Sequence, residues 1–418
     1  MYTTVRSGGI SESDNMKNRY FPTAVGLYFN YFVHGMGVIL MSLNMSSLEQ
    51  QWHTSAAGVS IVISSLGIGR LSVLLIAGML SDRFGRRPFI ILGTACYLIF
   101  FIGILYAQTI FVAYACGFLA GMANSFLDAG TYPSLMEAFP RSPSTANILI
   151  KAFVSGGQFL LPIIISLLVW ANMWFGWSFL LAGAIMLINA LFLLRCPFPP
   201  YPGRILKPKI SQAPVAGVHH CSLIDLISYT LYGYISMATF YLISQWLAQY
   251  GQFVAGMSYT QSIKLLSIYT CGSLLCVFIT APLVRKTIRS TTLLMFYTFI
   301  SFIALLTVCL HPQAYVVMIF AFVIGFSSAG GVVQIGLTLM AARFPQEKGK
   351  ATGIYYSAGS IATFTIPLIT ARISEMSIAH IMWFDTGIAA AGFLLALFIG
   401  YRSRAESQHH AEAASTAQ

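Results

Sequence analysis

An arginine and an aspartate stand out because each lies within a long apolar stretch. Arg70 falls in the run Ala56–Leu80, about 18 Å along a helix from Asp82, and Asp128 falls in the run Ile110–Ala138. A guanidinium can hold a carboxylate through two parallel hydrogen bonds. A buried carboxylate can change its protonation as its surroundings change. We therefore expect these side chains either to bind a charged solute and a proton, or to pair with each other as a structural contact.

Other polar side chains recur at helical spacing within apolar surroundings. Asn124, Asp128 and Tyr132 are four residues apart, so they share one face of a helix. Asn30 and His34 share this spacing, and Lys151, which could also pair with Asp128, forms a stripe with Ser155 and Gln158. The residues expected to contact a solute are Asn30, Arg70, Asn124, Gln158, Tyr241, Gln245 and Gln334. Asp128 and His34 are the candidates for proton handling. Each could instead be an ordinary hydrogen-bonding group between helices.

The elements that position these residues are apolar runs long enough to cross a bilayer. The chain is 57% hydrophobic and 8% charged, and such a chain cannot form a soluble globule of 418 residues. Most runs approach or exceed the roughly 20 residues of a transmembrane helix. They are Phe21–Met45, Ala56–Leu80, Phe89–Tyr106, Ile110–Ala138, Ala146–Trp170, Trp174–Leu194, Cys221–Leu247, Ser262–Val284, Thr291–Leu310, Ala314–Ala342, Ala351–Ile369 and Ile381–Tyr401. We predict an all-α membrane protein with twelve transmembrane helices.

The distribution of basic residues predicts the topology. If the amino terminus is cytoplasmic, the cytoplasmic segments hold all of the 23 Lys and Arg except Arg70, Lys151, Lys264 and Arg372. Positive charge is enriched on the cytoplasmic side of membrane proteins. Both termini are therefore expected in the cytoplasm. The formal charge of +11 follows from this bias, so no nucleic-acid partner is required.

The two halves of the chain repeat each other. At an offset of 205 residues, Phe139-Pro140 matches Phe344-Pro345 and Pro162 matches Pro367. A proline-rich segment between the halves contains no long apolar run, which is typical of a linker. We predict a tail over 1–20, a six-helix bundle over 21–194, a cytoplasmic linker over 195–220, a pseudo-symmetric six-helix bundle over 221–401 and a second tail over 402–418.

The loop after the second run carries the most specific motif. It reads GMLSDRFGRRP, and Gly78, Asp82, Arg83, Gly85, Arg86 and Arg87 have the spacing G-x-x-x-D-R-x-G-R-R. This resembles the cytoplasmic loop signature of major facilitator superfamily (MFS) transporters, in which the aspartate is thought to latch one half against the other. Gly78 would allow close helix approach, and Asp82 would accept hydrogen bonds at the start of helix eleven, near Lys350 or Ala351. The alternative is that these charges only solvate the loop and fix the topology. The corresponding loop of the second half, APLVRKTIR, contains no aspartate.

Three further stretches resemble bacterial inner-membrane MFS permeases of poorly assigned substrate. They are GIGRL at 67–71, NSFLDAGTYPSLMEAFP at 124–140 and GFSSAGGVVQIG at 325–336. The resemblance implies the MFS fold, a location in the bacterial cytoplasmic (inner) membrane and rocker-switch alternating access by a monomer. Arg70 favours a carboxylate-bearing organic acid as the solute, with a proton as the coupling ion. A sugar/proton symporter is the next interpretation, and a drug efflux antiporter ranks third.

Other classes of function lack their sequence features. No HExxH motif, Ser–His–Asp set or Gly-rich phosphate loop is visible, so we expect neither an enzyme nor a cofactor. The seven cysteines contain no CxxC pair, which disfavours a metal site. A receptor built on this fold would normally carry a sizeable soluble domain, and none is apparent. The expected partners are a small solute, protons and the lipid bilayer.

Overall fold

The computed structural model describes residues 19–139, 143–200, 223–286, 289–329, 332–343 and 348–416, and these residues form helices without a strand. The first half contains α1 (Phe21–Leu43), α2 (Met45–Trp52), α3 (Ala56–Phe84), α4 (Arg86–Tyr106), α5 (Ile110–Ala138), α6 (Pro143–Trp170) and α7 (Gly176–Arg195). The second half contains α8 (Leu223–Phe253), α9 (Tyr259–Lys286), α10 (Ser290–Leu310), α11 (Ala314–Ile324), η1 (Gly325–Ala329), α12 (Val332–Arg343), α13 (Lys348–Met376) and α14 (Ile378–Thr416).

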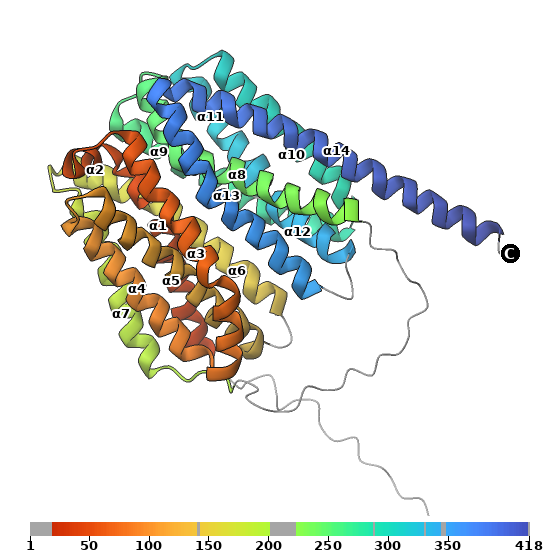
Figure 1. Cartoon of the computed structure of the whole chain (residues 1–418), viewed down its shortest axis with the longest axis horizontal. Helices are drawn as coiled ribbons and strands as arrows, with labels where there is room; N and C mark the ends of the chain where they lie inside the picture. Colours follow the sequence, from red (N-terminus) through yellow and green to blue (C-terminus); the bar gives the residue numbers. More distant parts are fainter. Residues whose placement is uncertain are drawn as a thin grey trace, which may run out of the picture.

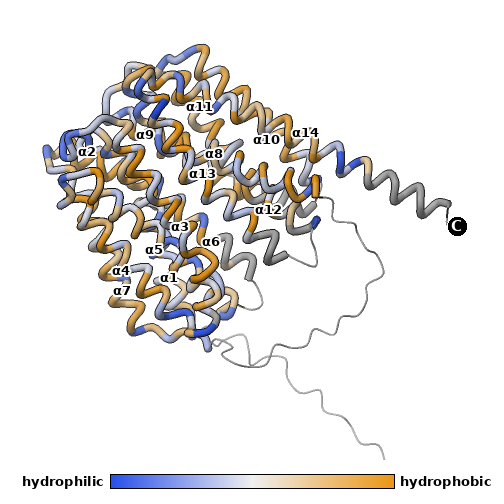
Figure 2. The backbone as a smooth tube through the Cα atoms, in the orientation of Figure 1, coloured by the Kyte–Doolittle hydropathy of each residue, from blue (hydrophilic) through white to orange (hydrophobic). Residues whose placement is uncertain are grey.

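Eleven of the described helices are long and apolar enough to span a membrane. Figure 2 shows hydrophobic residues along most of their length and hydrophilic residues mainly toward their ends. The expected tenth span is divided among α11, the π-helical turn η1 and α12, and the part that is apolar without interruption is short. The structure thus supports an all-helical membrane protein, and the count of twelve spans stays a prediction.

The π-helical turn lies where the chain approaches α9 most closely. A Cβ atom at Gly325 would lie 1.9 Å from the backbone oxygen of Tyr269, so only glycine fits at this contact. A π-turn inserts one extra residue into a helix and is common at functional sites. The π-helical turn that begins at Gly325 therefore interrupts the α-helix within the tenth apolar run, where the sequence suggested one continuous helix.

The helices form two groups that follow the two halves of the sequence. Within the first half α3 packs on α5, α4 on α5 and α1 on α6, and within the second half α10 packs on α14 and α8 on α13. The halves meet through α3 and α13, α6 and α9, and α1 and α8. In Figure 1 the two groups diverge from this seam toward the side where α8 begins and α14 ends. We call this the terminal side.

Two elements differ from the expected helix ends. The short helix α2 follows α1 directly, in a segment where no helix was expected. The last helix, α14, continues to Thr416, so helix covers most of the segment 402–418 that was expected to be a tail. Alanine and glutamate, which favour helices, are frequent in this segment.

Candidate functional site

A large cavity lies between the two halves. Its empty space is about 1510 Å³, open solvent at its mouth included. The first half contributes residues of α1, α3, α4, α5 and α6, and the second half contributes residues of α8, α9, α12 and α13. A space of this kind, shared by both bundles, is where a solute would contact both halves at once.

Arg70 and Asp128 form the ion pair at the wall of this cavity. The Arg70 Nη2 atom lies 3.1 Å from Asp128 Oδ2, and the other carboxylate oxygen accepts a hydrogen bond from the hydroxyl of Tyr31. Ser125 donates to the backbone oxygen of Arg70 at 2.8 Å and ties α5 to α3 beside the pair. The Nε atom of Arg70 is buried and has no hydrogen-bond partner. The aspartate is therefore engaged on both oxygens, while the guanidinium keeps one buried donor unused.

Lys151 is a second cation in the same cavity. It lines the cavity from α6, and it forms no ion pair among the described residues. The described lining contains Arg70, Lys151 and Asp128 as its Arg, Lys, Asp and Glu residues, so this described part of the wall has one cation more than it has acids. A buried cation without a partner is costly, which favours an anion as the occupant.

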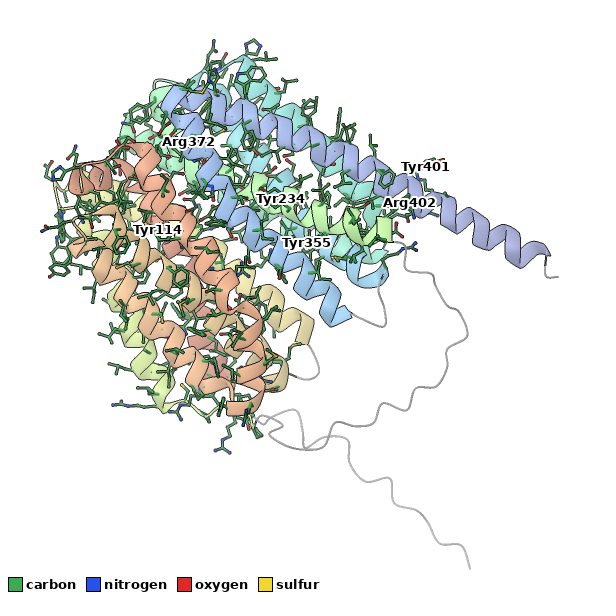
Figure 3. All side chains as sticks on the ribbon, in the orientation of Figure 1. Tyr114, Tyr234, Tyr355, Arg372, Tyr401 and Arg402 are labelled. Atoms are coloured by element: carbon green, nitrogen blue, oxygen red, sulfur yellow. The ribbon has the colours of Figure 1, made fainter. Side chains whose placement is uncertain are left out.

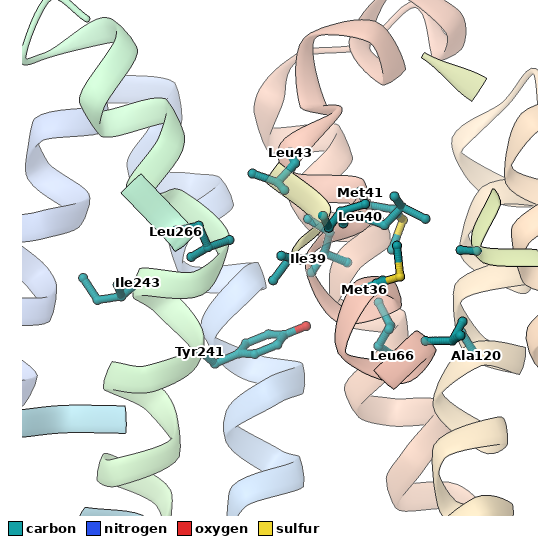
Figure 4. Packing of buried hydrophobic residues seen from close by; sticks show 14 of the residues in the cluster. Met36, Ile39, Leu40, Met41, Leu43, Leu66, Ala120, Tyr241, Ile243 and Leu266 are labelled. Carbon is teal, nitrogen blue, oxygen red and sulfur yellow. The ribbon is translucent and has the colours of Figure 1, made fainter. Parts of the chain in front are cut away.

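Aromatic side chains form much of the remaining wall. His34 Nδ1 is hydrogen-bonded to the hydroxyl of Tyr97. The rings of Tyr31 and Tyr132 pack edge to face, with 6.0 Å between their centroids. Figure 4 shows Tyr241 extending from α8 toward the helices of the first half. Sequence reasoning missed Tyr31 and Tyr97 as cavity residues. Tyr31 could have been found from its i, i+3 spacing to His34 on α1.

The structure places six of the nine solute and proton candidates at the cavity. These are His34, Arg70, Asn124, Asp128, Gln158 and Tyr241. Asn30 differs from its expected position: it is fully buried, does not line the cavity and accepts a hydrogen bond from Asn189 of α7 at 2.7 Å. His34 is four residues after Asn30 and three residues after Tyr31, so either residue could share its helix face. In the structure Tyr31 lines the cavity with His34, and Asn30 does not. The side chain of Gln334 lies outside the described residues.

Gln245 also differs from its expected position. Its Nε2 atom donates to the backbone oxygen of Val38 on α1 at 3.1 Å, so it joins the two halves instead of lining the cavity. Further links lie on the same side, away from the terminal side. Gln249 donates to the Ser42 oxygen at 2.5 Å, and the Tyr259 hydroxyl donates to the Leu43 oxygen at 2.7 Å. Ser60 donates to the backbone oxygen of Pro367 at 2.7 Å, and Ser267 donates to that of Phe159 at the same distance.

These links close the seam between the halves on the side opposite the terminal side. On the terminal side the two groups of helices diverge (Figure 1). A Cβ atom at Gly78 would meet nothing within 4 Å, so the close helix approach expected of this glycine is not made in this conformation. The cavity therefore opens toward the terminal side.

The residues of the loop motif brace helices within the first half. Gly85 has φ of 96°, a backbone conformation that favours glycine, and it lies between the end of α3 and the start of α4. Arg86 is buried, and its Nη2 atom lies 3.1 Å from Glu137 Oε1 of α5. It also donates to the Ser81 hydroxyl at 3.1 Å. This ion pair fixes the start of α4 against the end of α5.

The remaining motif residues occupy the surface of the loop. Arg87 donates to the backbone oxygen of Leu194 at the end of α7. The exposed Arg83 lies over the ring of Phe84, 5.4 Å from its centre. The side chains of Asp82 and of the expected helix-eleven contacts, Lys350 and Ala351, lie outside the described residues. The latch role of Asp82 stays a prediction.

Comparisons with known proteins agree with this architecture. The sequence profile of the Major Facilitator Superfamily matches residues 27–333 and 265–417. The chain is 80% identical to the inner membrane transport protein YdiM of Escherichia coli (strain K12), over 94% of this chain and 98% of that protein. It is 36% identical to the inner membrane transport protein YdiN of the same organism, over 94% and 93% of the two chains.

A solved structure extends the agreement to the fold. The crystal structure of a D-xylose-proton symporter superimposes with a TM-score of 0.75 at 16% identity, covering 91% of this chain and 97% of that one. Sequence profile, close relatives and fold lead to the same conclusion. The chain belongs to the Major Facilitator Superfamily and is a multi-pass transporter of the bacterial inner membrane.

Proposed function

We propose that this transporter moves a small carboxylate-bearing organic acid together with a proton. The observation that carries the proposal is the excess of positive charge in the central cavity, where Lys151 has no acidic partner among the described residues. A neutral solute would leave this charge uncompensated, whereas a carboxylate would neutralise it. An anionic cargo therefore suits the cavity better than a neutral one.

Arg70 would be the residue that orients the carboxylate. Its guanidinium uses Nη2 for Asp128 and keeps the buried Nε without a partner. A guanidinium binds a carboxylate best through two parallel N–H···O bonds, and a lysine ammonium acts as a point charge beside it. Lys151 of α6 would neutralise the solute from a second helix. Asn124, Gln158 and Tyr241 line the same space and would contact the hydroxyl or ring groups of the solute.

Proton coupling would follow from competition for Arg70. While Asp128 is ionised, it holds one edge of the guanidinium. A proton on Asp128 removes this competitor, so the solute carboxylate takes its place against the cation. Release of the solute lets Asp128 return to Arg70 and lose its proton. Tyr31, which already donates to Asp128, would keep the carboxyl in position throughout.

Alternating access would proceed by rocking the two bundles about this cavity. The seam is closed opposite the terminal side and open on the terminal side in this structure. With the terminal side in the cytoplasm, as the basic residues predict, this is an inward-facing conformation. The outward-facing conformation would close the terminal side, where Asp82 would meet the start of α13.

A sugar/proton symporter is the second candidate, and the aromatic wall favours it. Tyr31, Tyr97, Tyr132 and Tyr241 line the cavity, and the D-xylose-proton symporter has the same fold. Tyrosine rings and amides suit the faces and hydroxyls of a sugar. The unbalanced Lys151 would have no role in binding such a solute. This is why we rank the sugar second.

Binding to the purified protein separates these candidates. We would measure thermal stabilisation by a panel of carboxylic acids, their matched primary amides, neutral sugars and amphiphilic cations. Acids are expected to stabilise the protein and their amides are not. Arg70→Gln and Lys151→Gln should each abolish the effect of acids. Lys264→Gln removes an exposed lysine of α9 that does not line the cavity, and it should leave that effect intact.

The opposite result would overturn the proposal. Stabilisation by neutral sugars that survives in both cavity variants would establish the sugar interpretation. Stabilisation by amphiphilic cations alone would establish the efflux interpretation.

A further inference from the structure

Asp385 is a buried acid that the central cavity does not account for. It lies in α14, its exposed fraction is 0%, and neither of its carboxylate oxygens has a hydrogen-bond partner. It forms no ion pair among the described residues. Asp225, another acid buried in the second half, is bound at 2.7 Å by both Arg343 and Arg402. Asp385 thus lacks the positively charged partners that neutralise Asp225.

The groups that face Asp385 carry no positive charge. Thr239 of α8 interacts with its carboxyl without reaching ordinary hydrogen-bond geometry. The titratable neighbours are Tyr269 of α9 and Cys309 of α10, whose thiol contacts Thr386 at 3.3 Å. The described part of α13 contributes no titratable neighbour to Asp385. An isolated carboxylate is so costly to bury that such a group takes up a proton instead.

A small cavity lined by hydroxyl groups begins one helical turn from Asp385. On α14 it reaches Ala389 and Gly392, which share a face with Asp385. The facing polar residues are Tyr232, Ser236 and Thr239 of α8, Thr298 and Ser301 of α10, and Ser328 of η1. The hydroxyls of Tyr232 and Ser301 are buried without a partner. Unused buried hydroxyls around a void favour water as its occupant.

A second small cavity continues along the same pair of helices toward the terminal side. It is lined by Asp225, Ser228 and Tyr229 of α8 and by Phe398, Ile399, Arg402 and Ser403 of α14, with Arg343 of α12. Figure 3 labels Arg402 near the terminal-side end of the bundle. The two small cavities share no lining residue with the central cavity. Together they mark a polar seam between α8 and α14, inside the second half.

We propose that Asp385 is a second proton-binding carboxyl, filled from the terminal side through this polar seam. A proton would pass from water in the seam to a carboxylate oxygen of Asp385 and would return to water when the second half changes conformation. The void at Ala389 and Gly392 leaves space for water one helical turn from the acid, and the hydroxyls of Tyr232 and Ser301 would hold that water. This site goes beyond the solute site and does not require Asp128 to be the coupling residue.

Infrared spectroscopy of the purified protein tests the protonation directly. A neutral carboxyl has a C=O band separate from that of a carboxylate, and the band shifts when its proton is exchanged for deuterium. We expect a band of this kind that disappears in Asp385→Asn and persists in Asp128→Asn. Asparagine has the shape of the neutral acid, so the fold should tolerate it. If Asp385→Asn leaves every neutral-carboxyl band unchanged, the site is ionised and the proposal fails. No solute is present, so the result is independent of the transported cargo.

The route is tested by the rate at which the same band shifts in deuterated water. Tyr232→Phe and Ser301→Ala each remove a hydroxyl that has no partner, so their folding cost should be small. Both are expected to slow the shift severalfold. Thr307→Ala, which removes a hydroxyl of α10 away from the seam, should not. Equal rates in all four proteins would exclude the seam as the path of the proton.

Discussion

Gly67 of α3 lies against the backbone of Phe364 in α13, and this contact joins the two halves of the transporter. A Cβ atom at Gly67 would be 2.3 Å from the Phe364 nitrogen. About three turns further along the same helix, a Cβ atom at Gly78 would have no neighbour within 4 Å. The two glycines therefore report two levels of the same side of α3: it is in contact with α13 at Gly67 and has no neighbour at Gly78.

This relationship predicts opposite effects of two matched substitutions. Gly67→Ala should disfavour the present conformation, because its new methyl group would meet backbone that cannot move aside. Gly78→Ala should be tolerated here and should disfavour the conformation in which the terminal side is closed. Introduced cysteines on each side of the membrane, in a chain whose seven native cysteines are replaced by serine, would report the balance through their labelling rates.

The two labelling ratios should shift in opposite directions. A shift in the same direction for both variants would mean that α3 and α13 do not close at Gly78. The present structure would then represent the full extent of their contact.

Replacing Asp128 with Asn tests proton coupling. The amide can still contact Arg70 but cannot bind and release a proton. The variant should lose uphill accumulation of the solute, whereas exchange between preloaded vesicles should continue. Transport into proteoliposomes with and without an imposed pH gradient measures both activities. Accumulation against a gradient by the variant would exclude Asp128 as the coupling group and would direct attention to Asp385.

The pair of Arg86 and Glu137 predicts a difference in stability. Arg86 is buried, and its bond to Glu137 spans 3.1 Å. Glu137→Gln should lower the free energy of unfolding by about 1–3 kcal/mol, since a charged donor loses its charged acceptor. Glu375→Gln is the matched control: its ion pair with Arg372 is exposed and 3.9 Å long, so its loss should cost less than about 0.5 kcal/mol. Thermal unfolding in detergent compares the two. Equal losses would mean that burial adds nothing to the first pair.

Much of the fold could be predicted because it follows from hydropathy over long segments. A run of about 20 apolar residues has few alternatives to a membrane helix. The orientation that the basic loops indicate stays a prediction. The break at Gly325 could not be located in this way, because a π-turn depends on the backbone contact with Tyr269. The short helix α2 was missed for a different reason. A helix of eight residues has too short a hydrophobic pattern to be told apart from a loop.

The site could be predicted only in part. Polar residues occur on more than one face of these helices, and the sequence does not say which face lines the cavity. Arg70, Asp128 and His34 line the cavity, and their sequence signal was a polar side chain within an apolar run, where burial is costly. Asn30 and Gln245 belong to faces that pack on neighbouring helices. Asp385 was overlooked, although it is the one acid within the run Ile381–Tyr401, a signal as clear as that of Asp128.

Asp82→Asn tests the latch on the terminal side. An anion at a helix amino terminus contributes about 0.3–1 kcal/mol, and an amide loses the charged part of that interaction. The conformation closed on the terminal side should therefore lose roughly two- to fivefold in population relative to the present one. The cysteine-labelling ratio measures this change, and Glu49→Gln, in α2 on the opposite side, provides the control. Arg86 and Gly85 should keep the loop folded in the variant, because their contacts lie within the first half. An unchanged labelling ratio would leave Asp82 with a topological role alone.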